Sequence, residues 1–361
     1  MNDLPPELHG PAVWRGPEMA ARSDWIEPLS ADEVAEIEAA VHTNANADIA
    51  QLRAAHFPLP LLASRLARIR ADVLHGRGFA LLRGLPVQRW TLRQSATAFF
   101  GIGAHLGPAV SQNAKGHVLG HVQDLGLSAD DPNVRIYQTH ERQTFHTDSC
   151  DIVGLLCLQV AKHGGDSALV SSNTLWNEMR RRAPELAALL LEPVATDRRG
   201  EVPPGQKPYF TIPVFNWLVT HGGQTGDQTG DQKAGHMSAI YQRQYIDSAQ
   251  RFDDAPRLTP AHVAALDLFD ELANDPQLHF LMTLAPGDIQ LVHNHTLLHD
   301  RTAFTDWPEA ERRRHLLRLW LAPLDARPLP PVFAQRYGSV VPGARGGVPS
   351  PVALNAPLRA E

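Results

Sequence analysis

The sequence predicts a mostly β protein with flanking helices, built around a double-stranded β-helix, or jelly roll. Short strand-like runs dominate positions 136–170 and return over positions 278–323. The chain shows neither the regular strand–helix alternation of parallel sheets nor a glycine-rich phosphate loop. Helical patterns are concentrated on the N-terminal side and in insertions, where they would flank the sheets.

The composition argues against several classes of protein. The 361 residues include 33 basic and 39 acidic side chains, which give a formal net charge of −6, and no basic stripe predicts binding to nucleic acid. No apolar run is long enough to span a membrane, and the N-terminus lacks the pattern of a secretory signal. Cys150 and Cys157 should face opposite ways and stay reduced, so we expect a cytoplasmic protein.

The first 74 residues are expected to form a segment, partly irregular and partly helical, that packs on the core. Residues 1–27 are rich in proline and charge and are predicted to be irregular. Ser30 and Glu33 have the spacing of a capping box, which predicts a helix that runs to about Val41. A second helix is expected over residues 61–74.

Residues 75–335 are expected to form the jelly-roll domain with helical insertions. A buried strand is predicted within residues 76–87 and a helix within residues 91–107, which ends at a glycine. Further helices are expected over 174–182, continuing past a proline, and over 261–273, where a Thr-Pro pair starts the helix.

Two segments are expected to contribute little to the core. Residues 222–232, GGQTGDQTGDQ, are a small tandem repeat that predicts a surface loop of unassigned role. Residues 336–361 form a tail rich in proline, glycine and alanine, which we expect to be disordered or loosely attached from Val341 onward.

His146 and Asp148 lie two residues apart in TFHTDSCDIV, which has the pattern of a strand. Side chains at i and i+2 of a strand point to the same face, so an imidazole and a carboxylate would lie together. A single pair of this kind is more often a local hydrogen-bonding pattern than a metal site. Two histidines and one carboxylate, however, form the facial triad of non-haem Fe(II) oxygenases. A third ligand could come from His293, His295 or His299.

Arg318 strengthens the metal interpretation. In RRRHLLRLWLAP the alternation places Arg318 between Leu316 and Trp320 on one face of a strand that looks buried. A buried guanidinium is costly unless an anion pairs with it, and its geometry suits a carboxylate. An internal salt bridge remains the alternative, but beside a predicted iron site a co-substrate carboxylate explains more.

With these pieces together, the chain resembles the TauD/TfdA (taurine dioxygenase-like) family of Fe(II)/2-oxoglutarate-dependent dioxygenases. The resemblance covers roughly residues 75–335 and rests on FHTDSCDIVGLLCL, GGDSALVSS, PGDIQLVHNHTLLHDRTAF and RRRHLLRLWLAP, which stand in the family order. Each motif alone is weak, whereas the set is specific. It implies a cupin-like jelly roll, with Fe(II), 2-oxoglutarate and O₂ as the cofactor and co-substrates.

Carried over residue by residue, the resemblance implies that His146, Asp148 and His299 bind iron and that Arg318 holds the distal carboxylate of 2-oxoglutarate. Ser167 stands where the family has a threonine that hydrogen-bonds this co-substrate. Arg314 stands where relatives often have another arginine near the site. Related halogenases lack the carboxylate, so its presence disfavours halogenation.

The resemblance further implies oxidation of an unactivated C–H bond, with release of succinate and CO₂. Hydroxylation is the default outcome, and a small polar acid, such as an amino acid or a sulfonate, is the default substrate. Assembly into homo-oligomers is common among relatives. The candidates for substrate contacts are Gln112, Asn113, Arg135 and Tyr137, although Arg135 could instead form a surface salt bridge. Arg135 and Tyr137 are expected on a strand that leads to the metal pair.

Two other functions compete with the oxygenase. A redox-silent Zn or Mn hydrolase or isomerase on a cupin-like barrel would use the same three ligands but would not need Arg318. A binding or structural protein would need neither the triad nor the arginine. The complete set of four residues favours the oxygenase.

Overall fold

The computed structural model describes residues 4–128, 134–219 and 235–360. The Gly-Gln-Thr-Asp repeat expected as a surface loop lies outside the described residues. Among the helices of these described ranges, none is both long and apolar enough to cross a membrane.

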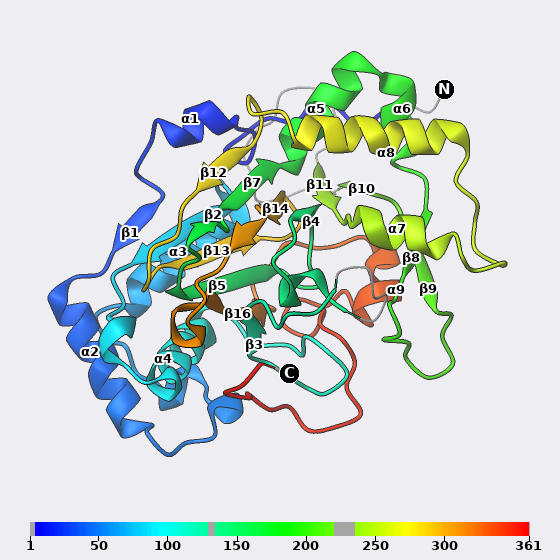
Figure 1. Ribbon diagram of the computed structural model, residues 1–361. Coiled ribbons are helices and arrows are strands. Elements are labelled where there is room, and N and C mark those ends of the chain that lie inside the picture. Colours follow the sequence, from blue (N-terminus) through cyan, green and yellow to red (C-terminus); the bar gives the residue numbers. More distant parts are fainter. Residues whose placement is uncertain (1–3, 129–133, 220–234, 361) are drawn as a thin grey trace.

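Two sheets form the centre of the molecule (Figure 1). The larger sheet has six strands in the order β1-β2-β13-β5-β16-β3, and the smaller has four in the order β12-β7-β14-β4. The large-sheet strands are β1 (Ile26–Pro28), β2 (Phe79–Arg83), β13 (Ile289–His293), β5 (Ile152–Gln159), β16 (His315–Leu321) and β3 (Gly120–Val122). Those of the small sheet are β12 (Phe280–Met282), β7 (Ser167–Ser171), β14 (Leu297–Arg301) and β4 (Gln143–His146).

Short ribbons and helices surround these sheets. The ribbons pair β8 (Val194–Asp197) with β9 (Tyr209–Ile212), β10 (Phe215–Val219) with β11 (Gly235–Ala239), and β15 (Phe304–Thr305) with β6 (His163–Gly164). The helices are α1 (Gly16–Ala20), α2 (Ala31–Thr43), α3 (Ala63–His75), α4 (Leu92–Leu106), α5 (Ser172–Arg182), α6 (Pro184–Leu189), α7 (Arg243–Ala249), α8 (Pro260–Ala273) and α9 (Ala334–Tyr337).

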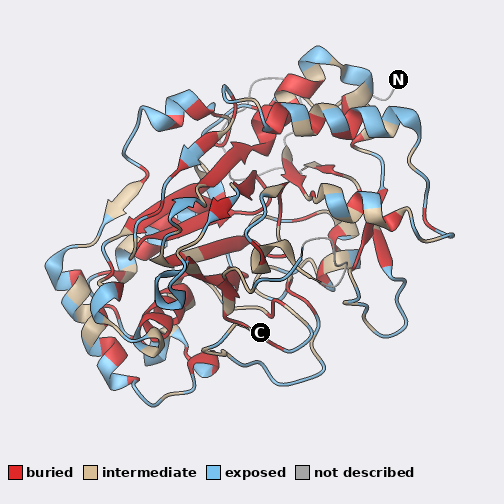
Figure 2. Cartoon of the chain, viewed as in Figure 1, coloured by how far each residue is buried: buried red, intermediate tan, exposed pale blue. Residues whose placement is uncertain are grey.

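Apolar clusters fix how these layers stack. Between the two sheets, Phe79 and Leu316 of the larger sheet pack with Leu169 and Leu297 of the smaller one. On the outer side of the larger sheet, α2, α3 and α4 pack against strand residues such as Leu319, and α5 and α8 cover the smaller sheet on its other side (Figure 1). The central strands are therefore buried along almost their whole length (Figure 2).

The expected helices and the first core strand are present with shifts of a few residues at their ends. Ser30 and Glu33 form the reciprocal capping box at the start of α2. Thr259 caps α8, which has a proline at its first position. The segment before residue 28 is more ordered than expected, because Trp14 and Trp25 pack against Phe79 and so hold α1 and β1 on the sheets.

Two expectations about strands near the metal pair are wrong. Arg135 and Tyr137 do not lie on a strand: residues Ile136–Gln138 form a 3₁₀ turn. Strand β4 ends at His146, so Asp148 lies in the connection that follows rather than two residues further along the same strand. A hydrogen bond to a distant part of the chain holds that connection instead: the Thr147 N–H donates to the Tyr241 carbonyl at 2.8 Å.

The expectation of a loosely attached tail is also wrong. Arg345 is buried and donates through Nη2 to Asp151 Oδ1 at 2.6 Å, next to the start of β5. Further on, the tail runs beside residues 116–118, where the Asn355 N–H donates to the Gly116 carbonyl at 2.9 Å. Composition misleads here because a few specific contacts hold this segment: these polar contacts to the core, and Val348, which is buried against Val153 and Trp320.

Because Arg345 anchors the tail, we expect a single substitution at this residue to lower the stability of the protein markedly. Arg345→Met would leave Asp151 as a buried carboxylate without its guanidinium partner, which costs about 3–5 kcal/mol in comparable cases. Arg359→Met, at an exposed position of the same tail, should change stability by no more than about 0.5 kcal/mol. Urea unfolding measures both variants. Equal midpoints for the two variants would mean that the tail is not anchored through Arg345.

Candidate active site

Antiparallel pairing of β4 and β14 builds the candidate metal site. The register places His146 directly opposite His299 on the smaller sheet. Asp148 completes the cluster: its Oδ1 lies 3.9 Å from His146 Nε2, and its Oδ2 lies 3.8 Å from His299 Nε2. One ligand atom from each residue lies within 4.8 Å of the other two, a spacing that one metal ion can bridge. The donor set, two imidazoles and a carboxylate, suits Fe(II).

The orientation of the His146 ring fits metal binding. His146 Nδ1 lies 2.8 Å from the Thr144 carbonyl, which can only accept, so the proton must reside on Nδ1. Nε2 therefore carries the lone pair, as in most histidines that bind metals. It faces Asp148, and it accepts from Gln143 Nε2 at 2.9 Å. His293 and His295, the other late histidines, do not join the cluster; His295 instead lies 3.0 Å from Asp151 Oδ1.

Three side chains from distant parts of the chain hold Asp148. Trp320 Nε1 donates to Asp148 Oδ2 at 2.8 Å, and Arg318 Nη1 lies 3.5 Å from the same oxygen. Asn294 clamps the backbone, because its Oδ1 accepts from the Asp148 N–H at 2.7 Å and its Nδ2 donates to the Asp148 carbonyl. The carboxylate is thereby positioned although it lies outside the strand.

The electrostatics keep all three ligands in the form that binds a metal. Burial lowers the pKa of His299 to about 3 and also lowers that of His146, so both rings are neutral near pH 7. Burial by itself would raise the pKa of Asp148, but Arg318, His299 and His146 together hold it below its ordinary value.

A small cavity extends from the metal cluster between the sheets. Val153, Leu155 and Leu316 give it apolar walls, and His299, Ser167 and Arg314 also line it. Arg314 is buried, and its Nη1 has no hydrogen-bond partner among the described residues. Burial lowers the pKa of Arg314 to about 10, as expected for a cation without an anion beside it.

Arg301 lines the same cavity and was not singled out from the sequence, although it lies two residues after His299. Its terminal nitrogens donate to the Thr139 and Glu141 carbonyls, and no carboxylate of the described residues lies within salt-bridge distance. Its pKa falls to about 9, first through burial and then through the neighbouring Arg314. Two buried cations therefore share one end of this cavity.

Gly165 allows Arg314 to lie there. A Cβ atom at Gly165 would lie 2.9 Å from the Arg314 Nε atom, and the residue has a φ of +76°, which disfavours any side chain. The Gly-Gly-Asp-Ser stretch thus supplies both the hydroxyl of Ser167 and the space for the arginine.

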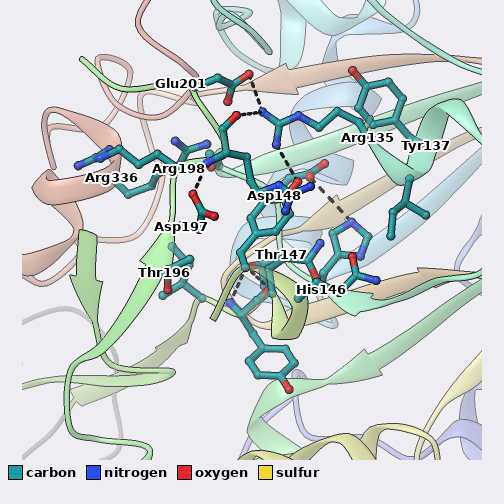
Figure 3. A pocket seen from close by; sticks show the side chains of 18 of the residues that line it. Arg135, Tyr137, His146, Thr147, Asp148, Thr196, Asp197, Arg198, Glu201 and Arg336 are labelled. Atoms are coloured by element: carbon teal, nitrogen blue, oxygen red, sulfur yellow. Dashed lines mark hydrogen bonds and ion pairs between the residues drawn. The ribbon is translucent and has the colours of Figure 1, made fainter. Parts of the chain in front are cut away.

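A second, larger pocket also reaches the cluster (Figure 3). It is lined by His146 and Asp148 and by three of the predicted substrate residues: Gln112, Arg135 and Tyr137. Asn113 does not reach it and instead lies 3.1 Å from His117 Nδ1. Tyr241 also contributes to the wall, whereas Phe215 is fully buried in the helix-covered core.

The predicted polar residues of this pocket are partly engaged by one another. Arg135 forms an ion pair with Glu201 at 3.0 Å and donates to the Tyr245 hydroxyl at 2.8 Å. Gln112 Oε1 accepts from Arg318 Nε at 2.8 Å, so it orients that guanidinium. The Arg318 guanidinium carbon also lies 4.6 Å from the centre of the Tyr137 ring.

Metal affinity should depend little on pH above pH 5.5. Two exposed histidines of ordinary pKa would lose about a hundredfold in affinity between pH 8 and pH 5.5, because protons compete for the imidazoles. The depressed pKa values of His299 and His146 remove this competition, so we expect a loss below about tenfold. Calorimetric titration with Co(II) at the two pH values measures it. A hundredfold loss would contradict the pKa assignment.

Comparison with known proteins identifies the family and the fold. Residues 45–320 match the model of the taurine catabolism dioxygenase TauD, TfdA family. FR-33289 synthase from Streptomyces rubellomurinus is 34% identical in an alignment of 328 positions that covers 89% of this chain and 92% of the relative. The taurine hydroxylase-like protein SAT17 from Stachybotrys chartarum is 28% identical, over 87% of this chain and 79% of that protein.

Solved structures agree on the architecture. Asparagine oxygenase, in complex with Fe(II), 3-hydroxyasparagine and succinate, superposes with a TM-score of 0.59 at 17% identity, over 82% of this chain and 93% of that one. The non-haem iron oxygenase OrfP, in complex with Fe and α-ketoglutaric acid, gives a TM-score of 0.57 at 14% identity over the same shares of the two chains. The jelly-roll prediction is confirmed, and the chain belongs to the TauD/TfdA family of Fe(II)- and 2-oxoglutarate-dependent dioxygenases.

Proposed function

We propose that this dioxygenase hydroxylates an unactivated C–H bond of a small polar substrate, with iron held by His146, Asp148 and His299. The observation that carries the proposal is the position of this cluster where two cavities meet. His146 and Arg318 line both the small cavity and the larger pocket. One cavity can therefore receive the co-substrate while the other presents the substrate to the same metal.

The lining of the small cavity suits 2-oxoglutarate in charge and polarity. The co-substrate has a polar keto-acid end, two methylene groups and a second carboxylate. The metal cluster would take the first end, Leu155 and Leu316 would contact the methylenes, and Arg314 would take the far carboxylate. Ser167 lines the same cavity, and its Oγ lies within hydrogen-bonding distance of Gln290.

This arrangement revises the role expected for Arg318. Its guanidinium lies 3.5 Å from an oxygen of Asp148, which is itself a proposed iron ligand. A guanidinium this close to a metal ligand is less well placed than Arg314 for the far carboxylate of a five-carbon diacid whose near end would chelate the metal. We therefore assign the far carboxylate to Arg314, with Arg301 adding positive charge, and give Arg318 the task of holding Asp148.

The chemistry divides between the bound groups and the chain. Iron with 2-oxoglutarate and O₂ supplies the oxidant that removes hydrogen from carbon and leaves succinate and CO₂. The chain positions what reacts: Trp320, Arg318 and Asn294 fix Asp148, and the walls of the larger pocket orient the C–H bond. Hydroxylation as the outcome is supported by the name of the Stachybotrys relative, a taurine hydroxylase-like protein.

A metal hydrolase on the same ligands accounts for less of the structure. It gives no use to the cavity lined by Arg301 and Arg314, whose two guanidinium groups have no carboxylate partner among the described residues. Burying unpaired cations is costly, and a dicarboxylate co-substrate offsets that cost.

Titration with 2-oxoglutarate distinguishes the roles of Arg314, which directly precedes β16, and Arg318, which lies on that strand. Under anaerobic conditions with Fe(II), wild type should develop a weak visible band as 2-oxoglutarate chelates the metal. Arg314→Met should need at least about tenfold more 2-oxoglutarate for the same band, because it loses a charge-assisted bidentate contact. Arg68→Met, which removes an exposed arginine paired with Glu27, should match wild type.

Arg318→Met should behave differently from Arg314→Met. It removes the cation beside Asp148, so we expect weaker iron binding before any 2-oxoglutarate is added. If instead Arg318→Met weakens the binding of 2-oxoglutarate and Arg314→Met does not, the far carboxylate binds to Arg318, as expected from the sequence. If wild type binds iron but shows no band, the dioxygenase proposal fails.

A further inference from the structure

Two arginines in the larger pocket lie together on the side away from His146 (Figure 3). Arg198 directly follows β8, and Arg336 comes from α9, so they are far apart in sequence. Their guanidinium carbons lie 5.3 Å and 5.8 Å from the centre of the same Phe210 ring. Arg198 also donates to the carbonyl of Gln335, the residue before Arg336, and Figure 3 shows the two side chains beside each other.

Neither guanidinium has a carboxylate partner within the described parts of the chain. Arg198 donates only to two carbonyls, those of Lys207 and Gln335, at 3.1 Å and 2.6 Å. Arg336 donates through Nε to the Ser149 hydroxyl at 2.8 Å, and its terminal nitrogens have no partner among the described residues.

The acidic residues of this pocket are already paired elsewhere. Glu201 forms its ion pair with Arg135, and Asp197 forms one with Arg251 at 3.1 Å. Asp148 belongs to the metal cluster. The pocket therefore carries a local excess of positive charge at Arg198 and Arg336, in a wall where Arg198 is buried.

Two neighbouring cations without an anion are unfavourable. Burial, and then the charge of Arg336, lower the pKa of Arg198 to about 10. An anion bound between the two groups would offset both the burial and the mutual repulsion.

We propose, on the basis of the dioxygenase function above, that Arg198 and Arg336 form a subsite for a phosphate or phosphonate group of the substrate. Two guanidinium groups offer several parallel N–H donors and two positive charges, which match a dianion with three terminal oxygens better than a singly charged carboxylate. The Ser149 hydroxyl accepts from Arg336 Nε, and its own hydrogen has no acceptor among the described residues, so it can donate to the same anion.

The position of the subsite also limits the substrate. Ser149 directly follows Asp148, so an anion held by Ser149 and Arg336 lies close to the metal cluster. The oxidised carbon should therefore be only a few bonds from the phosphorus atom. Arg314 lines the 2-oxoglutarate cavity rather than the larger pocket, so it does not contribute to this subsite.

Calorimetry with matched short acids tests the proposal. The probes are propylphosphonate, propanesulfonate and butyrate, each titrated at pH 8 into the enzyme loaded anaerobically with Fe(II) and 2-oxoglutarate. Wild type should bind propylphosphonate at least about tenfold more tightly than butyrate, with the sulfonate between them, because charge and oxygen number decide affinity. Arg336→Met should abolish this preference, and Arg68→Met, at an exposed arginine, should keep it.

Two further measurements separate a lost subsite from a lost fold. Arg336→Lys retains the charge and should recover part of the phosphonate affinity, whereas a purely structural role for the guanidinium would give no recovery. The visible band with Fe(II) and 2-oxoglutarate should be unchanged in Arg336→Met. Because Arg198 also ties its loop to the Gln335 carbonyl, Arg336 is the sharper position for the test.

The outcomes are distinct. If the wild-type band is present but propylphosphonate binds no better than butyrate, or binds equally to Arg336→Met, the subsite is wrong and the dioxygenase function stands. If wild type shows no band but Arg336→Met still loses phosphonate binding, the anion subsite stands and the proposed reaction fails.

Discussion

The pairing of β4 with β14 is the constraint on which the rest of the site depends. It places His146 opposite His299, so two imidazoles from distant parts of the chain face one point. The third ligand lies beyond the end of its strand and is held by side chains of the opposite sheet and the β13–β14 connection: Trp320, Arg318 and Asn294. The candidate metal cluster therefore forms only when both sheets are folded and packed against each other, so metal binding depends on an intact core.

The proposed division of labour follows from where positive charge is left without a partner. Arg301 and Arg314 are buried cations that line the small cavity, where the far carboxylate of a dicarboxylate co-substrate would pair with them. In the larger pocket, Arg198 and Arg336 would pair in the same way with an anionic group of the substrate. Arginines that already have acidic partners, such as Arg135 with Glu201, shape the walls instead.

The sequence singles out the candidate metal residues through the local spacing of His146 and Asp148, but it leaves the third ligand open among the late histidines; the structure brings His299 to the pair. The sequence alone does not decide between Arg314 and Arg318 for the far carboxylate, because alternation along β16 gives the face of a side chain but not its distance from the candidate metal residues. That distance depends on β16 pairing with β5 and on Asp148 leaving its strand. Arg198, Arg336 and the Arg345–Asp151 pair escape prediction altogether, since each joins segments far apart in the chain.

A crystal structure grown anaerobically with Fe(II) and 2-oxoglutarate tests the central claim most directly. The account predicts an anomalous iron peak in contact with His146, Asp148 and His299, with the far carboxylate of 2-oxoglutarate on Arg314. Iron bound at other residues, or a far carboxylate that lies on Arg318, would contradict it.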